Sequence, residues 1–421
     1  MRRVALISEH ASPLAVVGST DAGGQNVYVA QLAVHLARRG YQVDVFTRRD
    51  KSLARQIVDW RPGVRVVHVD AGPPRFMPKE DMLPYMEEFA RNTVAFFRRQ
   101  RDPYTLVHAN FFMSGMVARY VKQALNIPFV ITFHALGRVR RMFQGDADRF
   151  PESRIEIEET LVRDADRIVA ECPQDLADLA TLYGADARKV RVIPCGFDPS
   201  ELAPAGRRAR ADLGLGERDF VVLQLGRLVP RKGVDNVIRA VAELKRRYGV
   251  RARLLVVGGN SDTPSAEATP EIGRLQAIAH SEDVVEQVTF TGRRSRDALP
   301  ALYGAADVFV TTPWYEPFGI TPIEAMACGL PVVGAAVGGI KYSVVDRRTG
   351  FLVPPNDPAA LAQRMYVLSQ RADLAAMMGR EGQRRAWQLF TWSRVAGQVA
   401  QLYESVLPIR EHEVLRAETV A

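Results

Sequence analysis

Two glutamates, Glu316 and Glu324, bracket a short glycine-containing loop and the start of a predicted helix. Pro322 suits the first positions of that helix, because proline has no N–H group to lose there. In the first turn, Glu324 would lie close to the free N–H groups of Phe318–Ile320 and could accept two ribose hydroxyls. Glu316 could accept the hydroxyls of a sugar. The alternative is that Glu324 is only an acid favoured by the helix dipole, an effect worth up to about 1 kcal/mol.

A basic turn follows a predicted strand in the middle of the chain. Arg227 and Lys232 lie in this turn, just before a predicted helix start at Val234. Two cations beside a helix N-terminus suit a diphosphate group, which they can hold through charge-assisted hydrogen bonds. The same residues could form an exposed basic turn with no ligand, and the turn alone does not decide between these interpretations.

A pair of glycines, Gly23 and Gly24, ends a long loop and opens a predicted helix. Adjacent glycines allow the backbone to approach a ligand closely, and a helix N-terminus offers N–H groups and partial positive charge. A diphosphate would fit there, although a plain strand-to-helix turn would have the same pattern. The loop is not the GxGxxG fingerprint, and GxxxxGK[ST] occurs nowhere, which counts against NAD enzymes and P-loop NTPases.

A single histidine, His134, directly follows the predicted strand Phe129–Phe133. The carboxyl end of a strand is where open α/β sheets bind ligands, so this side chain is well placed to act on one. A lone histidine is also often structural, and both interpretations stay open.

Short β-branched runs alternate with amphipathic helical stretches, which predicts parallel sheets with helices on both faces. The strands predicted in the first half are Arg3–Ser8, Gln42–Thr47, Val64–Val69, Thr105–Ala109, Phe129–Phe133, Arg167–Ala170 and Val190–Ile193. Those in the second half are Phe220–Gly226, Arg253–Gly258, Val288–Thr291, Val308–Thr311, Val332–Ala335 and Gly350–Val353. Predicted helices include Gln25–Arg39, Val234–Tyr248, Asp357–Ser369 and Trp392–Leu407.

The rhythm stops at Pro194–Arg210, where prolines and glycines punctuate a stretch without periodicity, and then restarts. We therefore expect an α/β protein with two Rossmann-like, doubly wound domains that face each other across a cleft holding the active site. The predicted boundaries are 1–198, a linker at 199–211, 212–390, and a C-terminal helix and tail at 391–421 that pack back on the first domain.

The composition is that of an ordinary globular protein, with 47% hydrophobic and 25% charged residues. No apolar run reaches the roughly 18–20 residues of a membrane span, and the N-terminus does not resemble a signal peptide, so we expect a cytoplasmic protein. The net charge of +8 comes without an RNA-binding or helix-turn-helix pattern, which favours phosphate-bearing small molecules over nucleic acid. The three cysteines form no CxxC pair, so we expect neither a disulfide framework nor a zinc site.

Together these motifs resemble the retaining glycosyltransferases of the GT-B fold, in the large family 4 group. That group includes sucrose-phosphate synthases, sucrose synthases and D-inositol 3-phosphate glycosyltransferases. Glu316–Glu324 is similar to the family's E-x7-E motif, and the Arg227/Lys232 pair, the Gly23-Gly24 loop and His134 are similar to further family motifs. The likeness runs over nearly the whole chain, from about residue 3 to residue 407.

The resemblance implies a donor site in which two cations hold the diphosphate and neutralise its charge as it leaves. One glutamate would bind the ribose, and the other, with nearby N–H groups, would orient the donor sugar. The donor-binding residues so implied are Gly23, Gly24, Arg227, Lys232, Glu316, Phe318, Gly319, Ile320 and Glu324.

The resemblance also implies a mechanism that retains the anomeric configuration by attack on the same face, within a short-lived ion pair. His134 would contact the donor sugar and help stabilise its cationic transition state, so the catalytic residues would be His134, Glu316, Arg227 and Lys232. Stabilisation of the leaving group by fixed charges would be the main catalytic effect. No cofactor, no metal and no carboxylate nucleophile are expected.

For the acceptor, the resemblance implies contacts from Asn26, Lys79, Phe111 and Arg154. Lys79 and Arg154 keep the two cations that hold the acceptor phosphate in the inositol-phosphate enzymes. Phe111 and Ala135 stand where those enzymes carry a tyrosine and a threonine, and each lost hydroxyl is worth roughly 1 kcal/mol. A phosphorylated acceptor is therefore compatible with the sequence, but inositol phosphate in particular is less favoured.

We therefore expect transfer of a hexose, glucose or N-acetylglucosamine, from a nucleoside diphosphate sugar, UDP-linked by the resemblance, to a hydroxyl of a small acceptor. Three alternatives stay open. They are a glycosyltransferase acting on a membrane lipid or polysaccharide precursor through peripheral membrane contact, a non-catalytic nucleotide-sugar-binding protein, and a nucleotide-sugar epimerase. The E-x7-E motif with its paired cations favours transfer. The sequence predicts no oligomeric state.

Overall fold

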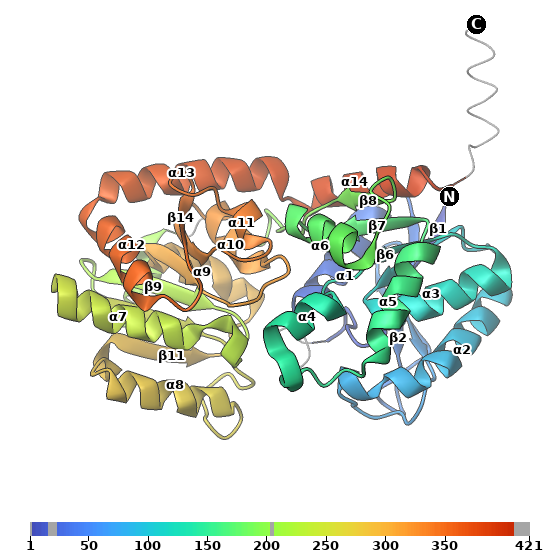
Figure 1. Ribbon diagram of the computed structural model, residues 1–421, viewed down its shortest axis with the longest axis horizontal. Coiled ribbons are helices and arrows are strands. Elements are labelled where there is room, and N and C mark those ends of the chain that lie inside the picture. The colour runs from blue at the N-terminus through green and yellow to red at the C-terminus, as the bar shows by residue number, and fades with distance from the viewer. Residues whose placement is uncertain (1, 16–22, 203–205, 408–421) are drawn as a thin grey trace, which may run out of the picture. The chain divides into compact units, whose positions relative to one another are not determined.

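The chain divides into two α/β units, drawn in Figure 1 from the computed structural model. The first unit comprises Met1–Ala15, Gln25–Pro194 and Ser393–Ala421, and the second comprises Val16–Gly24 and Cys195–Trp392. The structure describes residues 2–15, 23–202 and 206–407. Part of the predicted linker, residues 203–205, and the predicted tail after Pro408 lie outside the described residues.

The first unit is built on a sheet of eight strands in the order β3-β4-β2-β1-β5-β6-β7-β8. All neighbouring pairs are parallel except the edge pair β3–β4. Without β3, the order is that of a Rossmann-type sheet, which reverses between β1 and β5. The strands are β1 (Arg3–Ile7), β2 (Gln42–Arg48), β3 (Ile57–Arg61), β4 (Val64–Val69), β5 (Leu106–Asn110), β6 (Phe129–Thr132), β7 (Arg167–Ala170) and β8 (Val190–Val192).

Each strand predicted in this half is confirmed within one residue of its predicted bounds, and β3 was missed. β3 lies at the edge of the sheet and its residues are only exposed or half-buried, so it has no buried apolar run. It pairs with β4 through a turn at Pro62-Gly63, where Gly63 has a φ of +76°. That Pro-Gly pair between two β-branched runs was the available signal for a hairpin.

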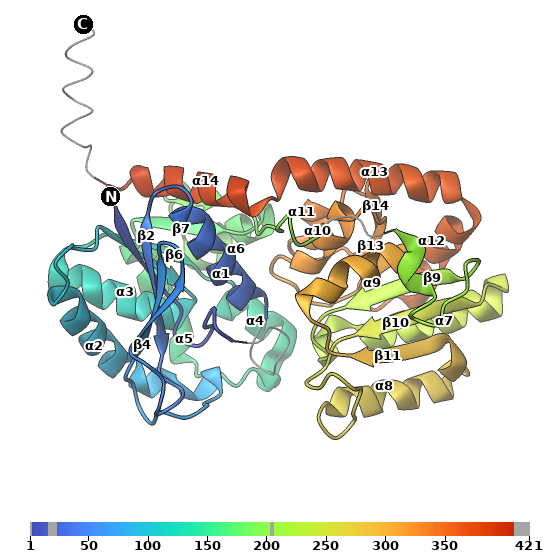
Figure 2. The same cartoon turned by 180° about the vertical axis from the view of Figure 1, so that it is seen from behind.

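Helices flank both faces of this sheet (Figure 1, Figure 2). They are α1 (Gly24–Ala37), α2 (Met86–Arg98), α3 (Phe112–Leu125), α4 (Gly137–Gln144), α5 (Ser153–Asp164), α6 (Pro173–Tyr183) and α14 (Trp392–Glu404), with short 3₁₀ turns such as η1 (Lys79–Asp81). Helix α14 is far along the chain, yet its Tyr403 hydroxyl lies 2.7 Å from Nδ1 of His108 in β5. His108 is fully buried, so this contact lies inside the first unit.

The second unit has a fully parallel six-stranded sheet in the order β11-β10-β9-β12-β13-β14, which reverses between β9 and β12. Both sheets thus have the same Rossmann-type switch point, where ligands bind beyond the carboxyl ends of the strands. The predicted strands are again confirmed within one residue. They are β9 (Phe220–Leu225), β10 (Ala252–Val257), β11 (Val288–Gly292), β12 (Val308–Thr311), β13 (Val332–Ala335) and β14 (Gly350–Val353).

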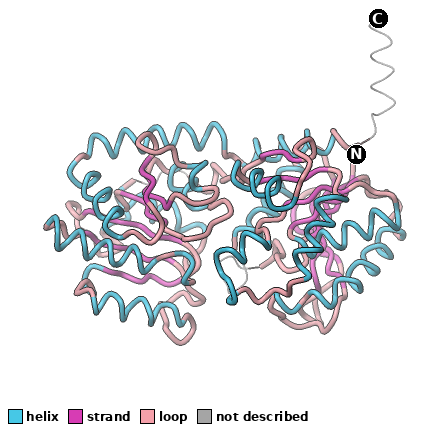
Figure 3. The backbone as a smooth tube through the Cα atoms, in the orientation of Figure 1, coloured by secondary structure: helices cyan, strands magenta, loops and turns pink. Residues whose placement is uncertain are grey.

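The helices of the second unit surround its strands, as Figure 3 shows by colour. They are α7 (Val234–Tyr248), α8 (Pro270–Ser281), α9 (Leu299–Ala305), α10 (Ile320–Ala327), α11 (Ile340–Ser343), α12 (Pro358–Gln370) and α13 (Ala372–Leu389). The central strands are buried along their whole length, as the residues of β12 and β13 illustrate. A parallel sheet covered on both faces requires such continuous apolar runs, and this is why the sequence pattern located them so well. Among the described residues, no helix combines the length and apolarity needed to cross a membrane.

Candidate active site

The basic loop, residues 226–233, joins β9 to α7 at the switch point of the second sheet. Its last residue, Gly233, has a φ of +64°, and a Cβ there would lie 2.0 Å from the carbonyl oxygen of Thr312. Thr312 follows β12, and its hydroxyl donates to the carbonyl of Gly233 at 2.9 Å. The basic loop is therefore fixed, backbone against backbone, to the start of the segment that carries Glu316.

Lys232 forms an ion pair with Glu316, so the two predicted site residues of different loops meet. Arg231 adds a second cation, with Nη1 3.5 Å from Oε2 of Glu316 and 3.0 Å from the carbonyl oxygen of Tyr315. The side chains of Arg231, Lys232 and Glu316 are 19%, 18% and 12% exposed, respectively. Such small exposure means that solvent screens these charges only partly.

The pKa values in this cluster follow from burial and from the neighbouring charges. Burial lowers the pKa of Lys232 to about 8, and Arg231 and Arg227 add to this effect while Glu316 opposes it. Burial alone would raise the pKa of Glu316, but Lys232, Arg231 and Arg227 outweigh it and lower that pKa. All three cations thus act on the carboxylate of Glu316, and a place where cations gather favours an anionic ligand.

The Glu316 loop, residues 316–319, ends at Gly319, whose φ is +89°, and α10 begins at Ile320, two residues before Pro322. The prediction that Glu324 lies in the first turn of the helix is therefore wrong, since it is the fifth residue of α10 and the first turn holds no acid. The helix starts directly after the left-handed backbone of Gly319, and the sequence pattern did not reveal this early start. The first N–H groups of α10 still lack acceptors within the helix and can receive a ligand.

Glu324 is 2% exposed and is held by two side chains of its own unit. Arg296 donates to Oε1 at 3.0 Å, and the Tyr303 hydroxyl donates to Oε2 at 3.1 Å. Arg296 also pairs with Glu201 at 2.6 Å. A carboxylate has about four acceptor positions. Glu324 therefore keeps acceptor capacity for two further hydroxyls.

In the first unit, His134 lies where the carboxyl ends of three neighbouring strands meet. Its Nδ1 is 3.0 Å from Oε1 of Glu171, which follows β7, and its Nε2 is 3.1 Å from Oδ1 of Asn110, the last residue of β5. The Tyr28 ring packs edge-on at 4.8 Å between centroids. Glu171 and Asn110 thus hold the ring from both sides and fix its orientation.

The predicted acceptor residues all belong to the first unit, but their environments differ. Asn26 is 2% exposed and donates to the carbonyl of Ser12 at 3.0 Å. Lys79, in η1, has a side chain 19% exposed and lies 3.5 Å from Glu80. Phe111 is 4% exposed and has a φ of +91° at the start of α3. Arg154 is 1% exposed and faces the interior, so these four residues do not form one open surface.

Of the predicted glycines, Gly24 is the first residue of α1 and Gly23 directly precedes it. Within the described residues, neither has a positive φ. The pair therefore does not form a left-handed turn, and its distinguishing property is the lack of side chains at a helix start.

Sequence reasoning missed Asn110, Glu171, Arg231, Arg296 and Tyr303. Asn110 and Glu171 lie at strand ends, the same position that marked His134, so the signal was present. Arg231 lies inside the basic loop that was already singled out. Arg296 and Tyr303 carried no local signal, because only the fold brings the segment from residue 296 to α9 against α10.

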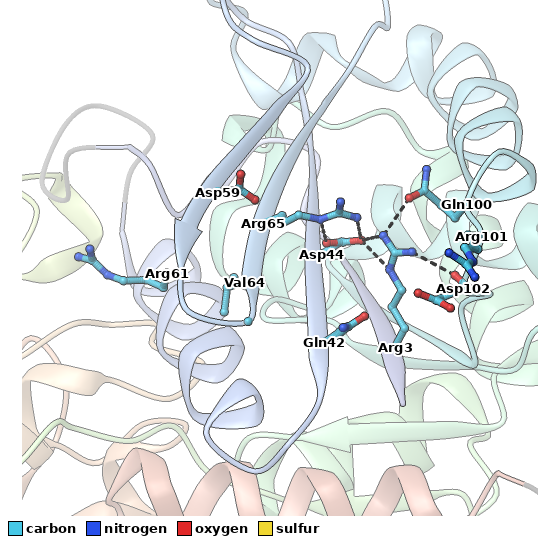
Figure 4. Close-up of a pocket in the computed structure, with 11 residues that line it drawn as sticks. Arg3, Gln42, Asp44, Asp59, Arg61, Val64, Arg65, Gln100, Arg101 and Asp102 are labelled. Carbon is cyan, nitrogen blue, oxygen red and sulfur yellow. Dashed lines mark hydrogen bonds and ion pairs between the residues drawn. The ribbon is translucent and has the colours of Figure 1, made fainter. Parts of the chain in front are cut away.

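A cavity of about 440 Å³ lies elsewhere in the first unit, at the amino ends of β1, β2 and β4 (Figure 4). Asp44 accepts from Arg3 at 2.7 Å, from Arg65 at 2.7 Å, and from the Tyr104 hydroxyl. His134 follows the carboxyl end of β6, whereas the cavity lies where the parallel strands begin, so the two are at opposite ends of the strands. We attribute its charges to the stability of the first unit.

Comparisons with known proteins identify the family of this chain. Residues 22–201 match the family described as Glycosyltransferase Family 4, and residues 207–385 match Glycosyl transferases group 1. The D-inositol 3-phosphate glycosyltransferase of Corynebacterium jeikeium is 36% identical over 411 residues, covering 96% of this chain and 97% of the relative. The chain belongs to the family 4 glycosyltransferases.

A further relative and two solved structures are also similar to this chain. The D-inositol 3-phosphate glycosyltransferase of Kineococcus radiotolerans is 38% identical, covering 98% of this chain and 97% of that protein. Sucrose-phosphate synthase from Thermosynechococcus elongatus superposes with a TM-score of 0.88 at 34% identity, covering 96% and 99% of the two chains. HepE from Anabaena, solved in complex with UDP and glucose, has a TM-score of 0.74 at 21% identity, covers 96% of this chain and 100% of its own, and shows the fold alone. The chain described here is thus a glycosyltransferase with the predicted GT-B fold.

Proposed function

We propose that this glycosyltransferase moves a hexose, glucose or N-acetylglucosamine, from a UDP-linked donor to a hydroxyl of a small acceptor, with retention of the anomeric configuration. The observation that carries the proposal is the partly buried cluster in which Arg231 and Lys232 pair with Glu316 and Arg227 acts on the same carboxylate. Its cations suit a departing nucleoside diphosphate, which gains negative charge as the glycosidic bond breaks. The resemblance to the sucrose-forming and inositol-phosphate enzymes supports UDP as the nucleotide.

On the donor side, Arg227 and Lys232 bind the diphosphate oxygens and stabilise them most when the C1–O bond is broken. Such differential binding of the transition state accelerates the reaction. Glu324 accepts the two ribose hydroxyls, held in place by Arg296 and Tyr303. Glu316 orients the sugar together with the N–H groups of the segment Phe318–Ile320, next to the glycines at 23 and 24.

At the reacting carbon, the acceptor hydroxyl attacks from the face that the diphosphate leaves. The C1–O bond to the diphosphate breaks, the bond to the acceptor oxygen forms, and the acceptor's proton passes to the departing diphosphate. His134, oriented by Glu171 and Asn110, contacts the donor sugar while the sugar carries positive charge. No side chain needs to form a covalent intermediate in this scheme.

The acceptor in this proposal is a small polyol or sugar that can carry a phosphate. The names of the curated relatives support a phosphorylated inositol, and Lys79 supplies a partly exposed cation for its phosphate. Phe111 and Ala135 offer no hydroxyl to such a ligand. We therefore include fructose 6-phosphate and unphosphorylated sugars among the acceptors to be tested.

A matrix of donors and acceptors tests the proposal. UDP-, GDP- and ADP-linked glucose and N-acetylglucosamine are each incubated with inositol 3-phosphate, fructose 6-phosphate, inositol and fructose, and nucleotide release is measured. The anomeric proton coupling of the product, read by NMR, reports retention or inversion. Transfer from a UDP sugar with retention supports the proposal. Inversion, or nucleotide-sugar binding without turnover for every pair, contradicts it.

A further inference from the structure

A buried ion pair in the first unit lies directly beneath the segment that follows His134. Arg154 and Glu158 are one helical turn apart in α5, and their side chains are 1% and 0% exposed. Nε of Arg154 donates to Oε1 of Glu158 at 2.7 Å. The guanidinium packs against the rings of Phe111, Phe112 and Phe150, with its carbon 4.9, 4.7 and 4.7 Å from their centroids.

Further hydrogen bonds of this pair hold the backbone of residues 135–138, while Nη1 of Arg154 has no hydrogen-bond partner among the described residues. Arg154 Nη2 donates to the carbonyl of Ala135 at 2.6 Å, and the N–H of Gly137 donates to Oε2 of Glu158 at 2.8 Å. The Tyr183 hydroxyl donates to Oε2 of Glu158 and accepts the N–H of Arg138 at 2.8 Å. Three side chains from α5 and α6 thus bind three of the four residues that follow His134.

His134 needs such support because its φ is +58°. A residue with a Cβ rarely adopts the left-handed region, and it stays there only when its surroundings fix it. Gly137 shows how tightly the segment is seated, since a Cβ there would lie 2.9 Å from Oε2 of Glu158. The carboxylate also lies at the N-terminus of α4, where a negative charge is favourable.

We propose that Arg154 and Glu158 are positioning residues, which set the backbone after His134 and thereby aim its ring at the donor sugar. The effect on catalysis rests on the proposed function, whereas the effect on the backbone after His134 does not. Both residues then act through the loop. A direct contact of Arg154 with an acceptor phosphate makes a different prediction, because it would leave reactions without acceptor unaffected.

Glu158→Gln is the informative change because a carboxylate accepts all three bonds and an amide cannot. Glutamine has one acceptor oxygen and one donor group. Whichever way it turns, its NH2 group faces the Nε–H of Arg154 or the N–H of Gly137. Glu159→Gln is the matched control, since Glu159 is the next residue of the same helix and its side chain is 43% exposed, paired with Arg138.

The kinetic test compares transfer with hydrolysis of the donor in the absence of acceptor. With the ring of His134 misplaced, both kcat values should fall together, by about 10- to 100-fold, while KM for the acceptor changes little. Glu159→Gln should match the wild type. A fall in transfer through KM alone, with hydrolysis intact, would overturn the inference in favour of a direct acceptor contact.

Amide hydrogen exchange provides the readout that does not depend on activity. The N–H groups of Gly137 and Arg138 should exchange faster in Glu158→Gln than in Glu159→Gln. Unchanged exchange would contradict the proposal that Glu158 holds the backbone of these residues. If the wild type turns over no nucleotide sugar, the proposed function fails while this measurement still decides the structural claim. If Glu158→Gln does not fold, Gly137→Ala tests the same contact, because it adds a methyl group without removing a charge.

Discussion

The charged loops of the two units are built in different ways. In the second unit, Arg231 and Lys232 both pair with the carboxylate of Glu316, and Arg227 acts on the same carboxylate. In the first unit, cations are paired with one carboxylate each, as in Lys79 with Glu80, Arg140 with Asp148, and Arg154 with Glu158.

The contrast indicates different roles for the charged residues of the two units. A loop that gathers several cations in a poorly solvated place favours an anion and stabilises negative charge that develops there. A region with matched charges recognises a ligand through geometry and hydrogen bonds, and its ion pairs fix the backbone. We therefore expect changes in the basic loop to affect the chemical step most, and changes in matched pairs to act through structure.

The largest effect should come from Lys232→Ala. The change removes a cation that stabilises the leaving diphosphate, and kcat should fall by about 10³-fold, as when a preorganised donor is lost from other active sites. Lys245→Ala is the control, since Lys245 pairs with exposed Asp283 in the same unit. Activity is measured by nucleotide release and folding by thermal melting. A well-folded variant with near-normal kcat would remove Lys232 from the mechanism.

Glu324→Gln should have the next largest effect, seen in donor binding. Arg296 and Tyr303 already use two acceptor positions of the carboxylate, so the single amide oxygen cannot also serve the ribose. Loss of hydrogen bonds to a charged group should raise KM for the donor by about 10- to 100-fold.

Glu282→Gln, which alters a carboxylate paired with Arg246 on the same unit, should leave KM for the donor unchanged. The interpretation of Glu324 as the ribose acceptor is wrong if both variants bind UDP equally well by calorimetry.

The pH profile should show the lowered pKa of Lys232. Because that pKa is about 8 in the folded protein, Lys232 loses its charge as the pH rises through about 8. The value of kcat/KM for the donor, which reports the free enzyme, should therefore decline above this pH. Lys232→Arg should remove the decline while lowering the plateau, because a guanidinium stays charged. An identical alkaline limb in both proteins would assign the titration to another group.

The smallest effect on activity should come from Asp44→Asn, near the amino end of β2 in the first sheet. Asp44 joins Arg3, Arg65 and Tyr104, and burial raises its pKa although Tyr104 and Arg3 lower it. Removing the charge should cost about 3–5 kcal/mol of unfolding free energy, measured with denaturant, because it leaves the buried guanidinium of Arg3 without its carboxylate. The kcat/KM of the folded variant should not change. A selective loss of turnover would show that this cavity takes part in function.

Much of the architecture could be predicted because each buried parallel strand is a continuous apolar run in the sequence. The runs Val308–Thr311 and Val332–Ala335 are buried on both sides, so each residue carries the apolar signal. β3 was missed because an edge strand needs no such run. The meeting of Lys232 with Glu316 was also predictable, since both follow carboxyl ends of strands in one sheet.

The sequence by itself determined the two Rossmann-type sheets, the strand ends and the types of residue that stand there, because these depend on the periodicity of neighbouring residues. Only the tertiary structure decided that Glu324 lies in the second turn of α10 beside Arg296 and Tyr303. It also decided that Arg154 faces Glu158 and three aromatic rings. Partners supplied by distant segments, and the backbone angle of a single glycine, are set by packing and leave no periodic trace along the chain.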